Sequence, residues 1–370
     1  MRGASGLCFL AAAFLTLCSC GGVGGPVRVV SLEGSWEEMG RQYGEQVSGE
    51  LKDVLEYVNL QTKGVAASSG EVERIAGTLY ELCTDSVRAF LDGVAATSGL
   101  TLRQLKTVNA VEYAEGSFAC SALAVWGPYT GGPVVMGRNY DAHAYLGLRN
   151  DVIVTVFHPS SERNAVAIVG YAGEIYAVNA MNSKGVFLEL NNGVLSGGAG
   201  NLFKTRPAPS LLLEAAFGAD DLAQVQTFME EHPCDASYII GAACPAGAKA
   251  FEWCYAGVRP GSTDTPDGMF CVTNHFVNPE WPYPAPEDSP DWQTYLRRKA
   301  MLRQAARHRG AITAGRMRRI MSTPVRLGGP FHRCTRYQLV VEPETSALWI
   351  RVPGRTGWHR LELSQYLDGR

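Results

Sequence analysis

The sequence lacks three features that mark common classes of binding protein. Its 33 lysines and arginines nearly balance its 36 aspartates and glutamates, so the formal net charge of −3 indicates no electrostatic partner. No basic run or basic-aromatic stripe points to nucleic acid, and we expect none as a partner. No C-x-x-C pair is present, which argues against structural zinc, and we expect no metal and no cofactor. With 46% hydrophobic and 19% charged residues, the chain suits a packed globular core.

A hydrophobic run long enough to cross a bilayer, which takes about 20 residues, is also missing. The apolar run at 7–17 follows Arg2 and ends in Leu17-Cys18-Ser19-Cys20. This ending resembles the lipobox of bacterial lipoproteins. The resemblance implies a signal peptide over 1–19, lipid on Cys20, a flexible tether over 20–27, and an exported protein held on a membrane. An ordinary secretory signal and a retained anchor helix are the alternatives.

Seven cysteines would remain after the leader is removed and Cys20 is acylated. Seven is odd, so at least one thiol stays unpaired even if the others form disulfides in an oxidising compartment. The spacing leaves the pairing open. These cysteines are Cys83, Cys120, Cys234, Cys244, Cys254, Cys271 and Cys334.

Periodicity divides the remaining chain into a helical part and a mixed part that share one domain. Apolar residues recur at helical spacing over 36–58 and 72–91, and Thr101 opens a third helix as a capping box with Gln104. We therefore expect a helical segment over 28–119. Short β-type runs separated by turns begin after Cys120, and blocks of strands and helices fill 120–370. Strands and helices in blocks favour an α+β fold.

Cys120 is the residue in the chain most suggestive of chemistry. It begins a strand after the loop at 116–119, and Arg138 and Asp141 follow the next strand. A hairpin of this length returns the chain beside its start, so both side chains could lie near Cys120. An arginine next to a cysteine favours the thiolate, and an aspartate would hold an α-ammonium group. A buried cysteine and a surface ion pair explain the same spacing without function.

A set of motifs resembles the penicillin acyltransferase-like family, which is related to choloylglycine hydrolases and acid ceramidase-like amidases among the N-terminal nucleophile hydrolases. Their order and spacing, between about 34 and 361, carry the resemblance. The segments are 34–45 (GSWEEMGRQYGE), 120–127 (CSALAVWG), 137–141 (GRNYD), 182–185 (NSKG) leading into 190–192 (LNN), and 272–276 (VTNHF). The resemblance implies a four-layer αββα sandwich.

The resemblance also implies a mechanism. The chain would cut itself between Ala119 and Cys120, and the freed α-amine of Cys120 would act as general base for its own thiol. Their ordinary pKa values, near 7.7–8.0 and 8.5, allow proton transfer at neutral pH. The substrate would be a small molecule with a linear amide bond, and both hydrolysis and acyl transfer stay open. By analogy the site residues are Cys120, Arg138, Asp141, Asn191, Asn274 and Arg297, with Arg298 as a second choice for the last.

Asn191 and Asn274 would serve as oxyanion donors or amine anchors, because neutral amide N–H groups suit a developing oxyanion. The chain departs from many members of this family by carrying Ala119 where they have glycine before the nucleophile.

Two other functions fit the same sequence. One is a conventional thiol hydrolase, with His275 or His143 activating Cys120 and Asn278 orienting the histidine. The other is a non-catalytic surface lipoprotein that binds ligand or host material.

Overall fold

The computed structural model describes residues 26–64, 69–115, 119–142, 148, 151–160, 164–175, 178–262, 264–290 and 292–368. The predicted signal peptide, Cys20, the loop at 116–118 and His143 lie outside the described residues. Within those ranges, no helix is both long and apolar enough to cross a membrane.

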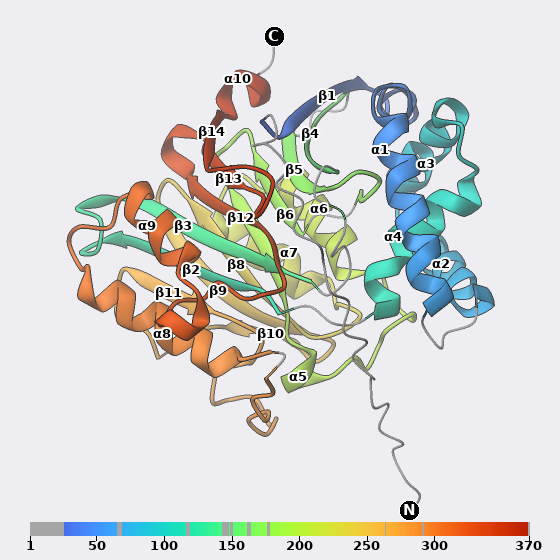
Figure 1. Cartoon of the computed structure of the whole chain (residues 1–370). Coiled ribbons are helices and arrows are strands. Elements are labelled where there is room, and N and C mark those ends of the chain that lie inside the picture. The colour runs from blue at the N-terminus through green and yellow to red at the C-terminus, as the bar shows by residue number, and fades with distance from the viewer. Residues whose placement is uncertain are drawn as a thin grey trace, which may run out of the picture.

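Two β-sheets form the centre of the molecule (Figure 1). The eight-stranded sheet has, in spatial order, β1 (Arg28–Gly34), β4 (Val152–Pro159), β5 (Val166–Tyr171), β6 (Asn179–Asn182), β7 (Phe187–Asn192), β8 (Tyr238–Cys244), β9 (Gly247–Cys254) and β10 (Gly257–Pro260). The six-stranded sheet has β11 (Met269–Val272), β2 (Ser121–Gly127), β3 (Gly132–Asp141), β12 (Thr335–Glu342), β13 (Ala347–Arg351) and β14 (His359–Glu362). All pairs are antiparallel except β1 with β4.

Alternation along the strands of the six-stranded sheet separates two cores. Ala122 and Ala124 of β2 face the eight-stranded sheet and join the large core between the sheets. Leu123 and Val125 point the other way, into a second core that includes Met301 and neighbouring side chains of α8 (Thr294–Arg307) and α9 (Ala314–Ser322). Because side chains alternate along a strand, one short apolar sequence supplies both layers.

The remaining helices lie against the eight-stranded sheet or beside it (Figure 1). Among them, α6 contacts the central strands β6 and β7, and α7 contacts β8, β9 and β10 at one edge. Trp36 at the start of α1 packs on Phe157 of β4 and Phe217 of α6. These helices are α1 (Trp36–Gly64), α2 (Ser69–Leu82), α3 (Asp85–Ser98), α4 (Leu102–Glu115), α5 (Val194–Gly197), α6 (Ala208–Gly218) and α7 (Leu222–Glu231); the short α10 (Ser364–Leu367) closes the chain. The order helix, sheet, sheet, helix confirms the predicted α+β fold with four αββα layers.

Helices α1 and α3 approach closely through glycine. A Cβ atom on Gly40 would lie 2.1 Å from the backbone oxygen of Phe90, and one on Gly93 would lie 2.2 Å from that of Glu37. No other residue type fits this crossing without moving a helix backbone. The contact packs the first helices of the chain against one another.

The structure corrects several predicted elements. The helix expected over 72–91 is two helices, because Thr84 takes an extended conformation and its hydroxyl caps α3 by accepting from the backbone N–H of Val87. Strands β1, β6, β10 and β14 were not expected from the sequence. Three of them are only four residues long, which is too short for a clear alternation pattern. The capping box is confirmed, since Thr101 and Gln104 bond each other's backbone N–H groups.

Candidate active site

The hairpin formed by β2 and β3 places Arg138 and Asp141 next to Cys120, as expected. Arg138 pairs in register with Ala122, two residues after Cys120. The Nη2 atom of Arg138 lies 3.6 Å from the Sγ atom of Cys120, and the backbone oxygen of Asp141 lies 4.0 Å from the same sulfur. The backbone N–H of Ala119 donates to that oxygen at 3.1 Å. The Ala119–Cys120 peptide bond therefore runs directly alongside Asp141.

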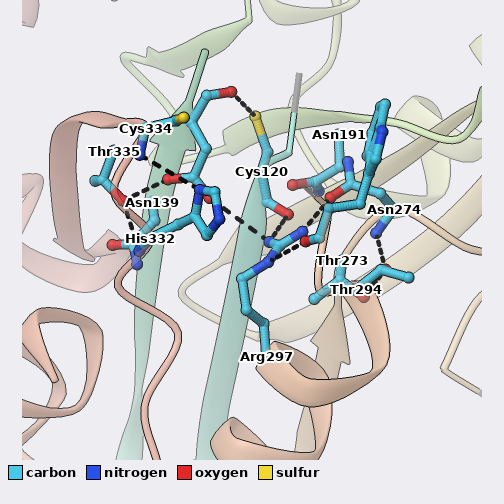
Figure 2. Close-up of polar contacts among 12 residues, drawn as sticks. Cys120, Asn139, Asn191, Thr273, Asn274, Thr294, Arg297, His332, Cys334 and Thr335 are labelled. Carbon is cyan, nitrogen blue, oxygen red and sulfur yellow. Dashed lines mark hydrogen bonds and ion pairs between the residues drawn. The ribbon is translucent and has the colours of Figure 1, made fainter. Parts of the chain in front are cut away.

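Arg297 holds the backbone carbonyl of Cys120 from the other side. Its Nη1 atom lies 2.5 Å from the Cys120 oxygen and its Nη2 atom lies 2.6 Å from Oδ1 of Asn274. Figure 2 shows this side chain between the two residues. Arg297 is fully buried and comes from α8, and Nη1 also lies 3.6 Å from Oδ2 of Asp141. One guanidinium thus connects three of the predicted site residues.

Asp141 has one satisfied and one unsatisfied carboxylate oxygen. Oδ1 accepts from the hydroxyl of Thr335 at 2.5 Å. Oδ2 is buried and has no hydrogen-bond partner among the described residues, since Arg297 is too distant to donate effectively. Burial raises the pKa of Asp141 to about 7, although Arg297 and the Thr335 hydrogen bond act to lower it. A buried acceptor without a donor is costly, and it marks a place where a cation or donor would be stabilised.

Arg138 is itself neutralised by a carboxylate that the sequence reasoning missed. It forms a fully buried ion pair with Glu189 of β7 and donates to the backbone oxygen of Leu190 at 2.7 Å. The Nδ2 atom of Asn191 donates to both oxygens of Glu189, at 2.7 and 2.8 Å, and to the backbone oxygen of Ile239 at 3.2 Å. The amide N–H groups of Asn191 are therefore directed at Glu189 and Ile239 in this arrangement.

Asn274 is held in place by its neighbours. Its backbone N–H donates to the hydroxyl of Thr294 at 3.0 Å, and its Nδ2 atom donates to the backbone oxygen of Asn192 at 2.8 Å. Because Arg297 binds the amide oxygen, the amide cannot rotate freely. Thr294 and Thr335 support the site, and no sequence signal indicated them. Glu189 did have a sequence signal, because it is the single charged residue in the otherwise apolar run 186–190.

The environment of Cys120 favours the neutral thiol. Burial raises the pKa of the Cys120 thiol above its usual value, and the charge of Asp141 acts in the same direction. Arg138 lowers it, but Glu189 pairs with the same guanidinium. The expected stabilisation of a thiolate by Arg138 is therefore outweighed by burial. A thiol in this state needs a nearby base before it can act as a nucleophile.

His275 does not contact Cys120. Its Nδ1 atom lies 2.7 Å from the hydroxyl of Thr294 and 3.3 Å from that of Thr273, and its ring packs on Tyr295. Burial, followed by the positive charge of Arg298, lowers the pKa of His275 to about 4. The amide of Asn278 donates to the backbone oxygen of Pro260 instead of orienting this ring.

The structure also separates two neighbouring arginines of α8. Arg298 forms an ion pair with Asp264 and donates to the backbone oxygen of Cys271 at 3.1 Å. Of these two arginines, Arg297 is the one that reaches Cys120. The seven described cysteines are all buried, and none of them forms a disulfide. Among the residues described, no group of three or more His, Cys, Asp or Glu side chains could hold a metal ion.

No protein-family model and no curated protein matches the chain. Solved structures similar to it include a Caenorhabditis elegans ortholog of N-acylethanolamine-hydrolyzing acid amidase, with a TM-score of 0.45, 17% identity, and coverage of 60% of this chain and 93% of that one. A variant of conjugated bile acid hydrolase from Clostridium perfringens has a TM-score of 0.44 and 12% identity, and the match covers 68% of this chain and 94% of that one. Penicillin V acylase from Agrobacterium tumefaciens has a TM-score of 0.41 and 10% identity, and the match covers 66% of this chain and 87% of that one. Likeness at this level assigns neither a family nor an activity to the chain.

Proposed function

We propose that this chain is a cysteine amidase that activates itself by breaking the bond between Ala119 and Cys120. The observation that carries the proposal is the buried Oδ2 atom of Asp141, which has no hydrogen-bond donor among the described residues and belongs to the residue beside that bond. An α-ammonium group on Cys120 would supply the missing donor and a compensating charge. No such group exists while the bond is intact.

The cleavage step uses groups that already surround the bond. The thiol of Cys120 attacks the carbonyl carbon of Ala119, and the C–N bond breaks as the nitrogen takes up a proton, which leaves a thioester and a free α-amine. Water then hydrolyses the thioester to a carboxylate on Ala119 and restores the thiol. Arg297, bound to the Cys120 carbonyl, would keep the new terminus in place during both steps.

The mature site would use the same thiol on a linear amide. The α-amine takes the thiol proton, the thiolate attacks the amide carbonyl, and the protonated amine returns that proton to the leaving group. Water or an amine then attacks the acyl-enzyme, so the site supports hydrolysis or acyl transfer. Of the two asparagines, Asn274 is the one that Arg297 links directly to the backbone carbonyl of Cys120, whereas the N–H groups of Asn191 are directed at Glu189 and Ile239.

The test is N-terminal sequencing of purified protein together with an assay for amine released from a library of linear amides. We expect a fragment that begins at Cys120 and activity that appears only with the break. Cys120→Ala should stay uncut and inactive. Full turnover by a chain proven intact across Ala119–Cys120 would favour the conventional thiol hydrolase. An unchanged biological effect of Cys120→Ala would favour the non-catalytic binding protein.

We also propose that the chain is exported and held on a bacterial membrane through lipid on Cys20, with residues 20–27 as the tether. The support is the lipobox-like sequence before Cys20 and the glycines that follow it. Stable anchoring takes more than one acyl chain, which lipoprotein modification would provide. Labelled palmitate fed to a bacterial host should enter the wild type, and equal labelling of Cys20→Ala would exclude this residue.

A further inference from the structure

The small net charge of the whole chain conceals an uneven distribution. Residues 292–341 contain no aspartate or glutamate, yet they contain twelve lysines and arginines. This segment forms α8, α9 and all of β12 but its last residue, and the two helices make up the outer layer on the six-stranded sheet. The remaining chain is correspondingly acidic. One face of the molecule therefore differs in charge from the rest.

Seven of these side chains are exposed, and we call six of them, all except Arg333, the basic face: Lys299, Arg303, Arg307, Arg309, Arg319 and Arg326. Three of them lie four residues apart along α8, which places them in one stripe on its outer side. Like charges at this spacing repel and weaken a helix slightly. A surface of opposite charge would relieve that repulsion.

The basic face has no acidic partner among the described residues. In the part of the chain that the structure describes, none of the six forms an ion pair with a carboxylate. Arg309 stacks over Tyr129, with its guanidinium carbon 5.4 Å from the ring centre. Stacking of this kind stabilises the planar group while its in-plane N–H donors stay available for phosphate.

The start of the described chain lies against β14, the edge strand of the sheet that α8 and α9 cover. The backbone N–H of Val27 donates to Nε2 of His359 on β14 at 3.1 Å. The next residue, Arg360, shares the ring of Trp349 with Arg318 of α9, at 5.7 and 3.8 Å from its centre. The elements can be followed in Figure 1. The seven residues from Cys20 to Val27 span about 25 Å at most when extended. A lipid on Cys20 would thus keep α9 near the bilayer.

We propose that the basic face docks the protein onto an anionic lipid bilayer, through contacts between its guanidinium groups and lipid phosphates. Clusters of four to eight basic residues beside a membrane anchor are enough for such binding. The charge of the face and the position of the chain start both favour a bilayer as the occupant. The second of these rests on the proposed lipid anchor at Cys20, and neither depends on the proposed amidase activity. Docking would fix the orientation of the domain on the membrane, which a flexible tether alone cannot do.

The test uses the full chain with Cys20→Ala, so that no lipid is attached, and vesicles of phosphatidylcholine with or without anionic phosphatidylglycerol. The variant Arg303→Gln, Arg307→Gln, Arg319→Gln removes three charges from the basic face. The matched control Lys52→Gln, Lys184→Gln, Lys249→Gln removes three exposed charges elsewhere. Because the parent and both variants carry the same residues 1–19, any contribution of that segment to vesicle binding is the same in all three. Unchanged thermal unfolding of both variants establishes that they fold.

We expect the parent to bind anionic vesicles at least tenfold more tightly than neutral ones, with weaker binding as salt increases. The basic-face variant should lose about 10- to 100-fold of that binding, and the control should lose less than about threefold. Equal loss in both variants, or equal binding to neutral and anionic vesicles, would overturn the proposal. Displacement from vesicles by double-stranded DNA at comparable phosphate concentration would also overturn it, because it would identify a general polyanion surface.

Discussion

The guanidinium of Arg138 and the carboxylate of Glu189 form an ion pair with 1% and 0% of their side chains exposed. Arg138 comes from the six-stranded sheet and Glu189 from the eight-stranded sheet, so the pair joins the two layers beside Cys120. Removal of one member leaves an uncompensated buried charge, which costs about 3–5 kcal/mol. The pair therefore couples the stability of the sandwich to the electrostatics of the candidate site.

Glu189→Gln is expected to lower the free energy of unfolding by about 3 kcal/mol, because Arg138 loses its partner. The double variant Arg138→Met, Glu189→Gln should lose less than the two single variants together. Chemical denaturation of Glu189→Gln, Arg138→Met and the double variant measures these free energies of unfolding. Glu50→Gln, which breaks the part-exposed pair with Arg28, is the control and should cost less than about 1 kcal/mol. Additive losses would show that the pair does not act as a unit.

Asp141→Asn should abolish most amide turnover while the protein stays folded. An amide N–H in place of Oδ2 cannot accept from the α-ammonium of Cys120, so we expect a loss of about 100-fold or more. The assay is release of amine, with circular dichroism to establish folding. Asp264→Asn removes a carboxylate that pairs with Arg298 instead, and its turnover should stay within about twofold of wild type. Similar losses in both variants would contradict the assigned role.

His275→Ala separates the proposed mechanism from a Cys/His pair. The imidazole bonds to threonine hydroxyls, and burial holds its pKa at about 4, so it stays neutral and has no contact with the thiol. We expect turnover within about threefold of wild type, since a general base is worth about 10²–10⁴-fold and this residue is not one. A loss in that range, with folding intact, would support the conventional thiol hydrolase.

The stability of the protein should fall as pH rises through about 7, in part because of Glu252. Burial raises the pKa of Glu252 to about 7, against an unfolded value near 4.3. The folded chain therefore binds this proton more tightly, so the stabilisation is complete below about pH 4 and disappears above pH 7. Glu252→Gln should weaken this dependence by about 2 kcal/mol between pH 5 and pH 8.

Denaturation curves at both pH values test this. Glu252 accepts from the backbone N–H groups of Val277 and Asn278, and a glutamine oxygen can still accept from them. Glu280→Gln is the control, because that carboxylate is largely exposed. An unchanged pH dependence in Glu252→Gln would show that other buried groups, such as Asp141, dominate it.

Much of the fold could be predicted from local pattern. The long helix α1 and the strands after Cys120 follow from apolar residues at helical and alternating spacing. The four short or unexpected strands could not be predicted in this way. Strand β1 belongs to its sheet because it pairs with β4, more than a hundred residues away, and no local signal encodes that pairing.

The sequence by itself determined that Arg138 and Asp141 lie beside Cys120, because a tight hairpin sets the register of β2 on β3. Only the tertiary structure decided which arginine of α8 joins them. Successive residues on a helix point about 100° apart, so once α8 packs on the six-stranded sheet, Arg297 faces Cys120 and Arg298 faces Asp264. The pairing of Glu189 with Arg138 likewise depends on the contact between two sheets, because these residues lie on strands that are not neighbours in either sheet.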